Sequence, residues 1–302
     1  MRQAARYLAT CATPPPPPPR TNDCEIPITI MLKPTRVDAF DHLKLRLTGP
    51  LSAGQRAELQ AHCRQLTQEG IKVSYAPNWS YVLEVSQPHA TFFPALLQVI
   101  GTEIAAEPAG AEVARDYTTR FRIEADRMLR YFLQTATLRH ASRKIKQFEQ
   151  SIYFGRRTRT RRLVLYADRR SKLSTPAKGQ YCLHTEVRLK GSPALRAARL
   201  GTVAEFHDFD FDGFWDRNMR FWEFGSRGAL GKNLKGKSTS DQAAHARARR
   251  MFSSKRYLVG TMFVLQKAMA ANPSMIRALN QISAKTWEKN ARNAALNGFR
   301  SG

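Results

Sequence analysis

The sequence has few acidic side chains and no long apolar run, and each of these features excludes some classes of protein function. There are 24 Asp plus Glu residues against 49 Lys plus Arg residues, which leaves a formal net charge of +25 on 302 residues. Such an excess is greater than solubility requires and favours a polyanionic partner, of which nucleic acid is the commonest. No run of eighteen apolar residues occurs, so no membrane-spanning helix is predicted.

An anionic membrane surface would also attract a basic chain. That alternative requires an amphipathic basic anchor helix or a lipidation signal, and the sequence offers neither. The amino terminus reaches no apolar core before its run of six prolines, which argues against a secretory signal. We therefore expect a cytoplasmic protein without a membrane partner.

Cysteine is sparse and scattered. The four cysteines form no Cys-x-x-Cys pair; they are Cys11, Cys24, Cys63 and Cys182. This spacing argues against a disulfide framework and against a zinc site made of cysteines alone. Reduced thiols are the expectation.

What the chain does contain divides it into three parts. Residues 1–36 hold the proline run and little apolar material, which predicts a disordered tail. Residues 37–225 carry most strand and helix patterns and are interpreted as a sheet domain. Residues 226–302 open with a Gly/Lys/Ser-rich linker, after which helical stretches are expected at 241–271 and 274–297.

The sheet domain begins with the order strand, helix, strand, strand, helix, strand. Alternating apolar residues predict the strands, and Ser52 caps an Ala/Leu/Gln/Glu-rich helix that Gly70 ends. The predicted elements are strand 42–48, helix 52–69, strands 71–76 and 81–85, helix 91–103 and strand 112–122. This order is that of the split βαβ unit, an α+β fold of RRM-like or ferredoxin-like type. Its antiparallel sheet carries both helices on one face and leaves the other face open for binding.

A second group of elements follows. One long basic helix is expected at 123–148, and two strands, 151–154 and 162–166, flank an arginine-rich turn. A well-alternating strand is predicted at 181–190, and Gly191-Ser192-Pro193 leads from it into a short helix.

Positive charge is densest between residues 139 and 172. Such a concentration would repel itself without anions, so phosphate contacts are the simplest explanation, with a solvated basic surface as the alternative. Tyr153, Phe154 and Tyr166 interleave with the arginines, where aromatic rings suit stacking on unpaired bases, although each could equally belong to the core. The predicted nucleic-acid contacts are Arg156, Arg157, Arg159, Arg161, Arg162, Arg169, Arg170, Lys172, Arg188 and Lys190.

Two predicted strands each present a carboxylate on a polar face. Side chains alternate along a strand, so His184 and Glu186 share one face of strand 181–190. On strand 112–122, Asp116 lies on the polar side in the same way. Both strands therefore offer ligand atoms to one face of the sheet.

Imidazole and carboxylate ligands on such a face could hold Mg²⁺ or Mn²⁺, which would polarise a phosphate for attack. We accordingly predict a metal site made of Glu186, Asp116 and His184. The alternative is a purely structural ion pair between Glu186 and either Arg162 or Arg188 across the sheet.

Three segments resemble the replication initiation factor family of plasmids and phages. They are Tyr153-Phe154-Gly155-Arg156-Arg157, Arg162-Leu163-Val164-Leu165-Tyr166-Ala167-Asp168 and His184-Thr185-Glu186-Val187-Arg188-Leu189-Lys190-Gly191. Members of that family show, in this order, a Tyr-Phe/Ile-Gly-Ser-Arg segment, an apolar strand ending in Tyr-Asp/Glu-Lys, and an Arg/His-x-Glu-x-x-Leu-Lys strand. By element order the match extends over residues 40–225.

The resemblance implies a rolling-circle replication initiator. Such an endonuclease binds an origin and nicks one DNA strand, single-stranded at the nick, through a tyrosine that stays linked to the 5′ phosphate. A divalent metal held by acidic residues assists, and a host helicase would be a partner. Glu186 matches the acidic ligand of the family, and Tyr166 matches the nucleophile.

Two departures from the family pattern leave choices open. Asp168-Arg169 replaces the family's lysine after the tyrosine, so Tyr153 stays a second candidate for the nucleophile. Asp116 has no second aspartate nearby, which leaves open whether the metal site is complete. A protein that kept the sheet and lost the active site would bind DNA or RNA without cutting it.

Two further segments match motifs of other protein classes. Residues 231–238 fit the phosphate-binding loop of nucleotide hydrolases, with Lys237 as its lysine, but no buried strand directly precedes them. The segment Asp208-Phe209-Asp210-Phe211-Asp212 begins like a calcium loop, but Met219 stands where a bidentate glutamate belongs. An amphipathic structural edge is the preferred interpretation of the second segment.

Overall fold

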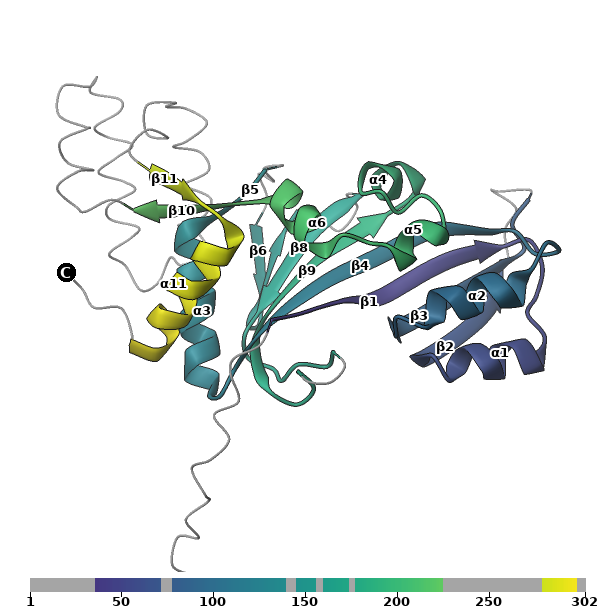
Figure 1. Ribbon diagram of the computed structural model, residues 1–302, viewed down its shortest axis with the longest axis horizontal. Coiled ribbons are helices and arrows are strands. Elements are labelled where there is room, and N and C mark those ends of the chain that lie inside the picture. Colours follow the sequence, from purple (N-terminus) through teal and green to yellow (C-terminus); the bar gives the residue numbers. More distant parts are fainter. Residues whose placement is uncertain are drawn as a thin grey trace, which may run out of the picture. The chain divides into compact units, whose positions relative to one another are not determined.

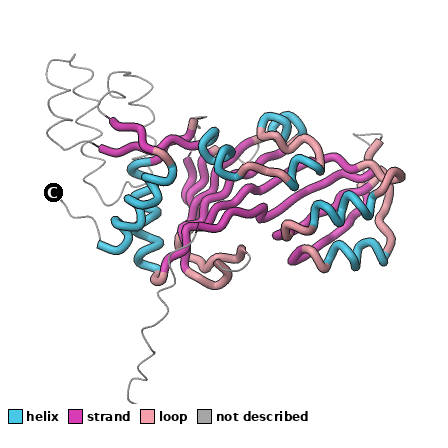
Figure 2. Tube along the Cα trace, viewed as in Figure 1, coloured by secondary structure: helices cyan, strands magenta, loops and turns pink. Residues whose placement is uncertain are grey.

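The computed structural model describes residues 36–71, 78–139, 145–155, 160–173, 177–224 and 279–297. They form a mixed α+β structure built on antiparallel sheets (Figures 1 and 2). The predicted tail up to residue 35, the linker, the helix at 241–271 and the 231–238 loop with Lys237 lie outside the described residues. Within those ranges, no helix is long and apolar enough to cross a membrane, and Cys63 and Cys182 are buried free thiols.

Eight strands form the main sheet, in the order β2-β3-β1-β4-β9-β8-β7-β6. The strands are β1 (Arg36–Leu47), β2 (Cys63–Gly70), β3 (Tyr81–Pro88), β4 (Ala106–Thr119), β6 (Ile145–Phe148), β7 (Ser151–Phe154), β8 (Arg161–Tyr166) and β9 (Tyr181–Lys190). All neighbouring strands of this sheet pair in an antiparallel manner. The order predicted for the amino-terminal part, strand, helix, strand, strand, helix, strand, is the order observed.

Seven helices and a second, three-stranded sheet complete the described part. The helices are α1 (Ala53–Gln60), α2 (Phe92–Ile100), α3 (Arg122–Thr135), α4 (Ser192–Ala197), α5 (Ala204–His207), α6 (Phe211–Asn218) and α11 (Ala284–Asn297). The second sheet has the order β11-β10-β5, from the strands β5 (Ala136–Leu138), β10 (Met219–Phe224) and β11 (Leu279–Ile282).

The core lies between the helices and one face of the main sheet. Alternation along β1 sends Leu43, Leu45 and Leu47 to this helix-covered face, where each is at most 1% exposed. From the helices, Leu59 of α1 and Phe92 of α2 are fully buried in the same cluster. Burial of so many large apolar side chains is what holds the helices on this face.

Three predicted helices are longer than the helices observed, and the strands expected at 42–48 and 112–122 begin six residues earlier, at Arg36 and Ala106. The helix expected at 52–69 ends at Gln60, and the following residues form edge strand β2. The capping box at Ser52 starts the helix as expected, with Gln55 N donating to Ser52 Oγ at 3.2 Å. Backbone pairing of β2 with β3 overrides the helical tendency of the stretch beyond. Most of the strand expected at 71–76 lies outside the described residues.

The basic helix expected at 123–148 ends at Thr135, and β5 and β6 follow it. Thr137 on β5 accepts a hydrogen bond from the buried Trp222 indole at 2.9 Å, so tertiary contacts favour a strand there. The carboxy-terminal helix expected at 274–297 begins only at Ala284, because Ser283 caps it by accepting from Thr286 N at 3.1 Å. Strand β11 precedes it.

Trp287 anchors α11 to the rest of the fold. Its side chain is fully buried, and its ring packs against Tyr117, Phe132 and Phe221 at centroid distances of 5.3, 5.4 and 4.7 Å. The indole Nε1 donates to Thr135 Oγ1 at 2.8 Å. One aromatic side chain thus joins α3, the main sheet and the second sheet.

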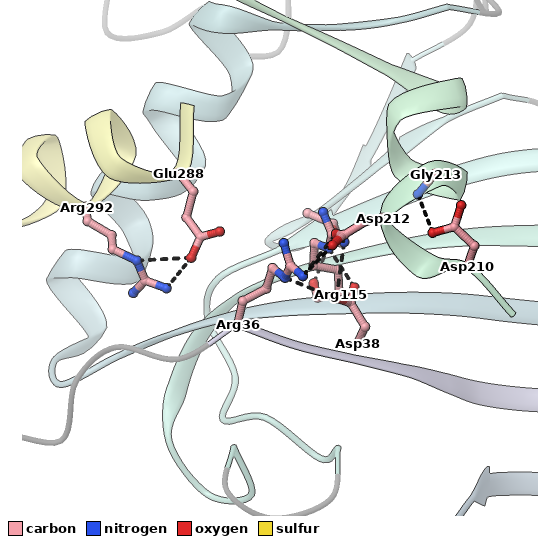
Figure 3. Close-up of polar contacts among 9 residues, drawn as sticks. Arg36, Asp38, Arg115, Asp210, Asp212, Gly213, Glu288 and Arg292 are labelled. Carbon is pink, nitrogen blue, oxygen red and sulfur yellow. Dashed lines mark hydrogen bonds and ion pairs between the residues drawn. The ribbon is translucent and has the colours of Figure 1, made fainter. Parts of the chain in front are cut away.

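A charged cluster surrounds the buried Arg115 on the helix-covered face, and we call Arg36, Asp38, Arg115 and Asp212 the helix-side cluster (Figure 3). Arg115 is 1% exposed and donates from Nε to Asp38 Oδ1 at 2.6 Å and from Nη2 to Asp212 Oδ1 at 2.7 Å. Arg36 contacts the same two carboxylates at 3.1 and 3.0 Å. Two arginines therefore balance two aspartates, and the contacts tie β1 and β4 to α6.

The Phe/Asp segment that begins like a calcium loop belongs to this structural cluster. Phe209 and Phe211 pack on Phe40 at centroid distances of 5.1 and 5.2 Å. Asp210 caps α6 by accepting from Gly213 N at 2.8 Å (Figure 3). Both phenylalanines therefore pack in the core, Asp210 caps a helix and Asp212 pairs with arginines, in agreement with the structural interpretation.

Candidate active site

The face of the main sheet that points away from the helices carries the predicted site residues, and we call it the polar face. Residues paired across neighbouring strands project to the same side. His184 on β9 is paired with Asp116 on β4 and with Tyr166 on β8, and Glu186 lies one alternation further along β9. The four residues predicted to converge therefore share one face.

His184 occupies the centre of this site. Its Nδ1 lies 2.6 Å from Asp116 Oδ1, and its Nε2 lies 3.2 Å from Glu186 Oε2. Burial alone would lower the pKa of the imidazole, but the charge and hydrogen bond of Asp116, followed by those of Glu186, raise it to about 10. A protonated imidazole that donates to both carboxylates is the form this geometry favours.

Arg188 holds the other side of Glu186. Its Nε hydrogen-bonds Glu186 Oε1 and lies 3.2 Å from Glu112 Oε1. Burial would raise the pKa of Glu186, but the hydrogen bonds and charges of His184 and Arg188 lower it. Burial and then the negative charge of Glu186 raise the pKa of Glu112 to about 7. Glu186 therefore forms the ion pair with Arg188 that was considered as the structural alternative. It also lies next to His184, as the predicted metal site requires.

Tyr166 covers the imidazole. The two ring centroids lie 4.3 Å apart with planes inclined by 18°, and the Arg169 guanidinium carbon lies 5.1 Å from the Tyr166 centroid. The tyrosine is half-buried, and its surroundings are polar. Burial, followed by the charges of Asp116, Asp41 and Glu186, raises its pKa above the usual range. The hydroxyl therefore lies within the field of the same carboxylates that surround His184.

Asp41 completes the group of ligand atoms, and the sequence analysis missed it. One ligand atom each from Asp41, His184 and Glu186 lies within 4.8 Å of the others. Asp41 sits where the register of β1 against β4 shifts between Phe40 and His42, as in a β-bulge. The spacing of apolar residues carried a signal of this bulge, because Phe40 and Leu43 stand three apart, whereas Leu43 and Leu45 stand two apart.

Asp116, which was predicted as a ligand, lies behind the imidazole. It is fully buried, contacts Nδ1 of His184, and accepts a hydrogen bond from Ser171 Oγ. Ser171 Oγ in turn accepts from Leu173 N at 3.2 Å, so the chain after β8 folds over this part of the site. The polar face is therefore less open here than the sequence predicted, and Asp116, His184 and Glu186 are at most 3% exposed.

The predicted nucleic-acid contacts are placed by the register. Arg162 and Arg188 are paired with each other on the polar face, and the Arg162 guanidinium carbon lies 4.0 Å from the Tyr153 ring centroid. Arg161 is paired with Leu189 in the helix-side row, where burial lowers its pKa. The exposed members are Arg169, Arg170, Lys172 and Lys190; Arg156, Arg157 and Arg159 lie outside the described residues.

The aromatic residues considered for stacking also divide between the faces. Phe154 is 1% exposed and is paired with Leu163, so it belongs to the core. Tyr153 is half-buried, is paired with Val164 and lies on the polar face. Only Tyr153 and Tyr166 of the three therefore reach the face that carries the site.

Comparison with known proteins gives a likeness to solved structures but no match by sequence. No protein-family model matches the sequence, and no curated protein matches it. Among solved structures, the chain is similar to a rolling circle replication initiator protein from Geobacillus stearothermophilus, with a TM-score of 0.40 and 13% sequence identity over 64% of this chain and 89% of that chain.

Proposed function

We propose that this chain starts rolling-circle replication of a plasmid or phage by cleaving one strand of origin DNA through Tyr166, beside a divalent cation bound by Asp41, His184 and Glu186. One observation carries the proposal: the tyrosine ring lies 4.3 Å from the imidazole of that ligand group, on one face of one sheet. Residues 37–225 would form the nicking domain. We assign its first four strands to the split βαβ type, since they pair in the order β2-β3-β1-β4.

The ligand group fits Mg²⁺ or Mn²⁺. It offers one imidazole and two carboxylates, a donor set that suits Mn²⁺ and, through its oxygens, Mg²⁺. Negative charge is also in excess, because four carboxylates surround His184 and Arg188; they are Asp41, Glu112, Asp116 and Glu186. When bound, a divalent cation would polarise the scissile phosphate. Asp116 would act as a positioning residue, because a carboxylate on the far nitrogen fixes the orientation of a ligating imidazole.

In the proposed step, the Tyr166 hydroxyl oxygen forms a bond to phosphorus, and the bond from phosphorus to the 3′ oxygen breaks. The phenolic proton leaves, and the released 3′ oxygen takes up a proton. The products are a free 3′ hydroxyl and a protein joined to the 5′ phosphate. Arg169, beside the Tyr166 ring, is placed to attract the phosphate.

Covalent adducts test this step directly. A randomised single-stranded oligonucleotide pool, labelled at its 3′ end, is incubated with the protein and MnCl₂, and adducts are resolved on a denaturing gel. The wild type and Tyr153→Phe should form a labelled adduct, whereas Tyr166→Phe should form none. Adducts that persist in Tyr166→Phe and vanish in Tyr153→Phe would show that Tyr153 is the nucleophile.

The same assay separates an enzyme from a binder without catalysis. Asp41→Asn and Glu186→Gln should lose adduct formation, while Asp208→Asn, at an 89% exposed side chain, should retain it. A wild-type protein that shifts DNA in a salt-dependent manner but forms no adduct with Mn²⁺ or Mg²⁺ would refute the nicking proposal in favour of the binder.

A further inference from the structure

Two aromatic side chains on the outer strands of the polar face have no role in the chemistry proposed above. Phe148, at the end of β6, is 66% exposed, more than any other large apolar side chain in the described part of the chain. Tyr153, on β7, is half-buried and lies under the Arg162 guanidinium. A large apolar side chain that stands singly on a protein surface is normal, so any role of these two rings depends on where they lie relative to the site.

The sheet register aligns both rings with the site. Phe148 is paired with Ser151, and because Ile152 is paired with Leu165, Ser151 comes level with Tyr166. Phe148 thus belongs to the cross-strand row that contains Tyr166 and His184.

The neighbouring row of the polar face holds the second ring. Tyr153 is paired with Val164, which is paired with Glu186. Since neighbouring strands lie about 4.8 Å apart, Phe148 stands about 10 Å from Tyr166, and Tyr153 stands about 10 Å from Glu186, measured across the sheet.

The turn that follows Phe148 is tied to the same region. Glu149 Oε2 lies 4.0 Å from Arg169 Nη2, and Arg169 contacts the Tyr166 ring. On its other side the turn is held by Gln150, whose Oε1 accepts from Arg122 Nη2 at 3.0 Å. These contacts link the turn after Phe148 to Arg169, which contacts the Tyr166 ring.

Charge decides which partner suits this surface. Arginines stand between and beside the rings, with Arg162 over Tyr153 and Arg169 over Tyr166, and the whole chain carries +25. Single-stranded nucleic acid matches both features, because its bases stack on rings and guanidinium planes while its phosphates pair with arginines. Protein interfaces also contain aromatic and arginine side chains, so the net charge of +25 is what favours a nucleic acid over a protein here.

We infer that unpaired bases beside the cleaved phosphate stack on Phe148 and on the Tyr153–Arg162 pair, so that a single strand crosses the polar face from the site toward the β6 edge. The assignment of the strand to DNA rests on the proposed function. It gives Tyr153 a role in holding substrate rather than in attacking it.

Binding in the absence of metal tests the inference without requiring cleavage. The affinity for a fluorescein-labelled dT₁₂ is measured by fluorescence anisotropy in EDTA. Phe148→Ala and Tyr153→Leu should each weaken binding about 5- to 150-fold, the range expected for loss of one stacked base. Phe148→Tyr and Tyr153→Phe keep a ring and should bind as the wild type does. Leu97→Ala, at an exposed position on α2 of the helix-covered side, is the control and should also bind normally.

Stacking, rather than a general contact, is identified by abasic oligonucleotides. A series of oligonucleotides is used in which one base at a time is removed. For the wild type, removing the base that stacks on Phe148 should weaken binding. For Phe148→Ala, removing that same base should leave the affinity unchanged. Wild-type affinity in both ring-deleted variants would overturn the inference, and so would an equal loss of affinity for duplex DNA. Adduct formation is a separate readout, so a protein that stacks bases without cutting would contradict only the proposed function.

Discussion

Two charged clusters lie on opposite faces of the main sheet, and the neighbouring residues Arg115 and Asp116 of β4 belong to one each. Arg115 points to the helix-covered face and joins the helix-side cluster, where two arginines meet two aspartates. Asp116 points to the polar face, where His184 and Arg188 meet four carboxylates. The two arginines and two aspartates of the helix-side cluster balance one another, so this cluster needs no further partner. The polar-face cluster has more carboxylates than cationic groups, so it can bind a cation.

The surroundings of the two clusters also differ. Trp215 of α6 covers Arg115, whose guanidinium carbon lies 5.4 Å from the indole centroid, while Asp212 at the edge of the helix-side cluster is 62% exposed. The polar-face cluster is bordered by Tyr166 and Arg169, both of which reach solvent. A cluster whose charges balance stabilises the fold, while a cluster with an excess of carboxylates suits the binding of a cation.

The largest effect is expected from Arg115→Met. Removing Arg115 leaves the mostly buried Asp38 carboxylate with only Arg36 as its partner, which should lower the free energy of unfolding by about 3 kcal/mol. Urea denaturation in EDTA measures this change. Arg292→Met, which breaks only the i,i+4 contact with Glu288 on α11 (Figure 3), is the matched control and should cost about 0.5 kcal/mol. A smaller loss in Arg115→Met than in this control would contradict the structural role.

Manganese should stabilise the protein through the polar-face cluster alone. At a free Mn²⁺ concentration one hundred times the Kd, the free energy of unfolding should rise by about 2.7 kcal/mol, because the ion binds only the folded state. Thermal unfolding with and without MnCl₂ measures the gain. Glu186→Gln should abolish it, and Asp212→Asn in the helix-side cluster should leave it intact. An equal gain in Glu186→Gln would place the ion elsewhere.

Asp116→Asn should weaken Mn²⁺ binding without abolishing it. The asparagine keeps the shape of the contact with His184 but loses its charge, and loss of such an outer carboxylate reduces metal affinity about 10- to 100-fold. Isothermal titration calorimetry measures the Kd, with Asp208→Asn as the control that should match the wild type. Complete loss of binding in Asp116→Asn would instead make Asp116 a ligand, as the sequence analysis predicted.

The smallest effect concerns Glu112 and pH. Its pKa is raised from 4.5 to about 7 in the folded protein, so the folded state binds more protons than the unfolded state, and this group lowers stability as the pH rises between those values. Glu112→Gln removes the contribution. Relative to the wild type, the variant should become more stable as the pH rises from 4 to 8, measured by urea denaturation in EDTA. Parallel pH profiles for the two proteins would refute the shift.

Much of the fold and of the site follows from strand alternation. The strands at 151–154, 162–166 and 181–190 were predicted within one residue of β7, β8 and β9, because each is a short run with a clear apolar side. The long helices were predicted poorly. Helical propensity at 52–69 and 123–148 is real, but β2 and β5 form where pairing partners are available, and propensity contributes less than that pairing.

By itself, the sequence determined which side of each strand is polar, and therefore that His184, Glu186, Asp116 and Tyr166 could meet on one face. A period of two needs no knowledge of the neighbouring strands. Only the tertiary structure decided which atoms touch: it brought Asp41 in through an irregularity of β1, set Asp116 behind the imidazole, and paired Arg161 with the helix-side row. Register and bulges depend on contacts between strands far apart along the chain, and no local pattern of residues specifies those contacts fully.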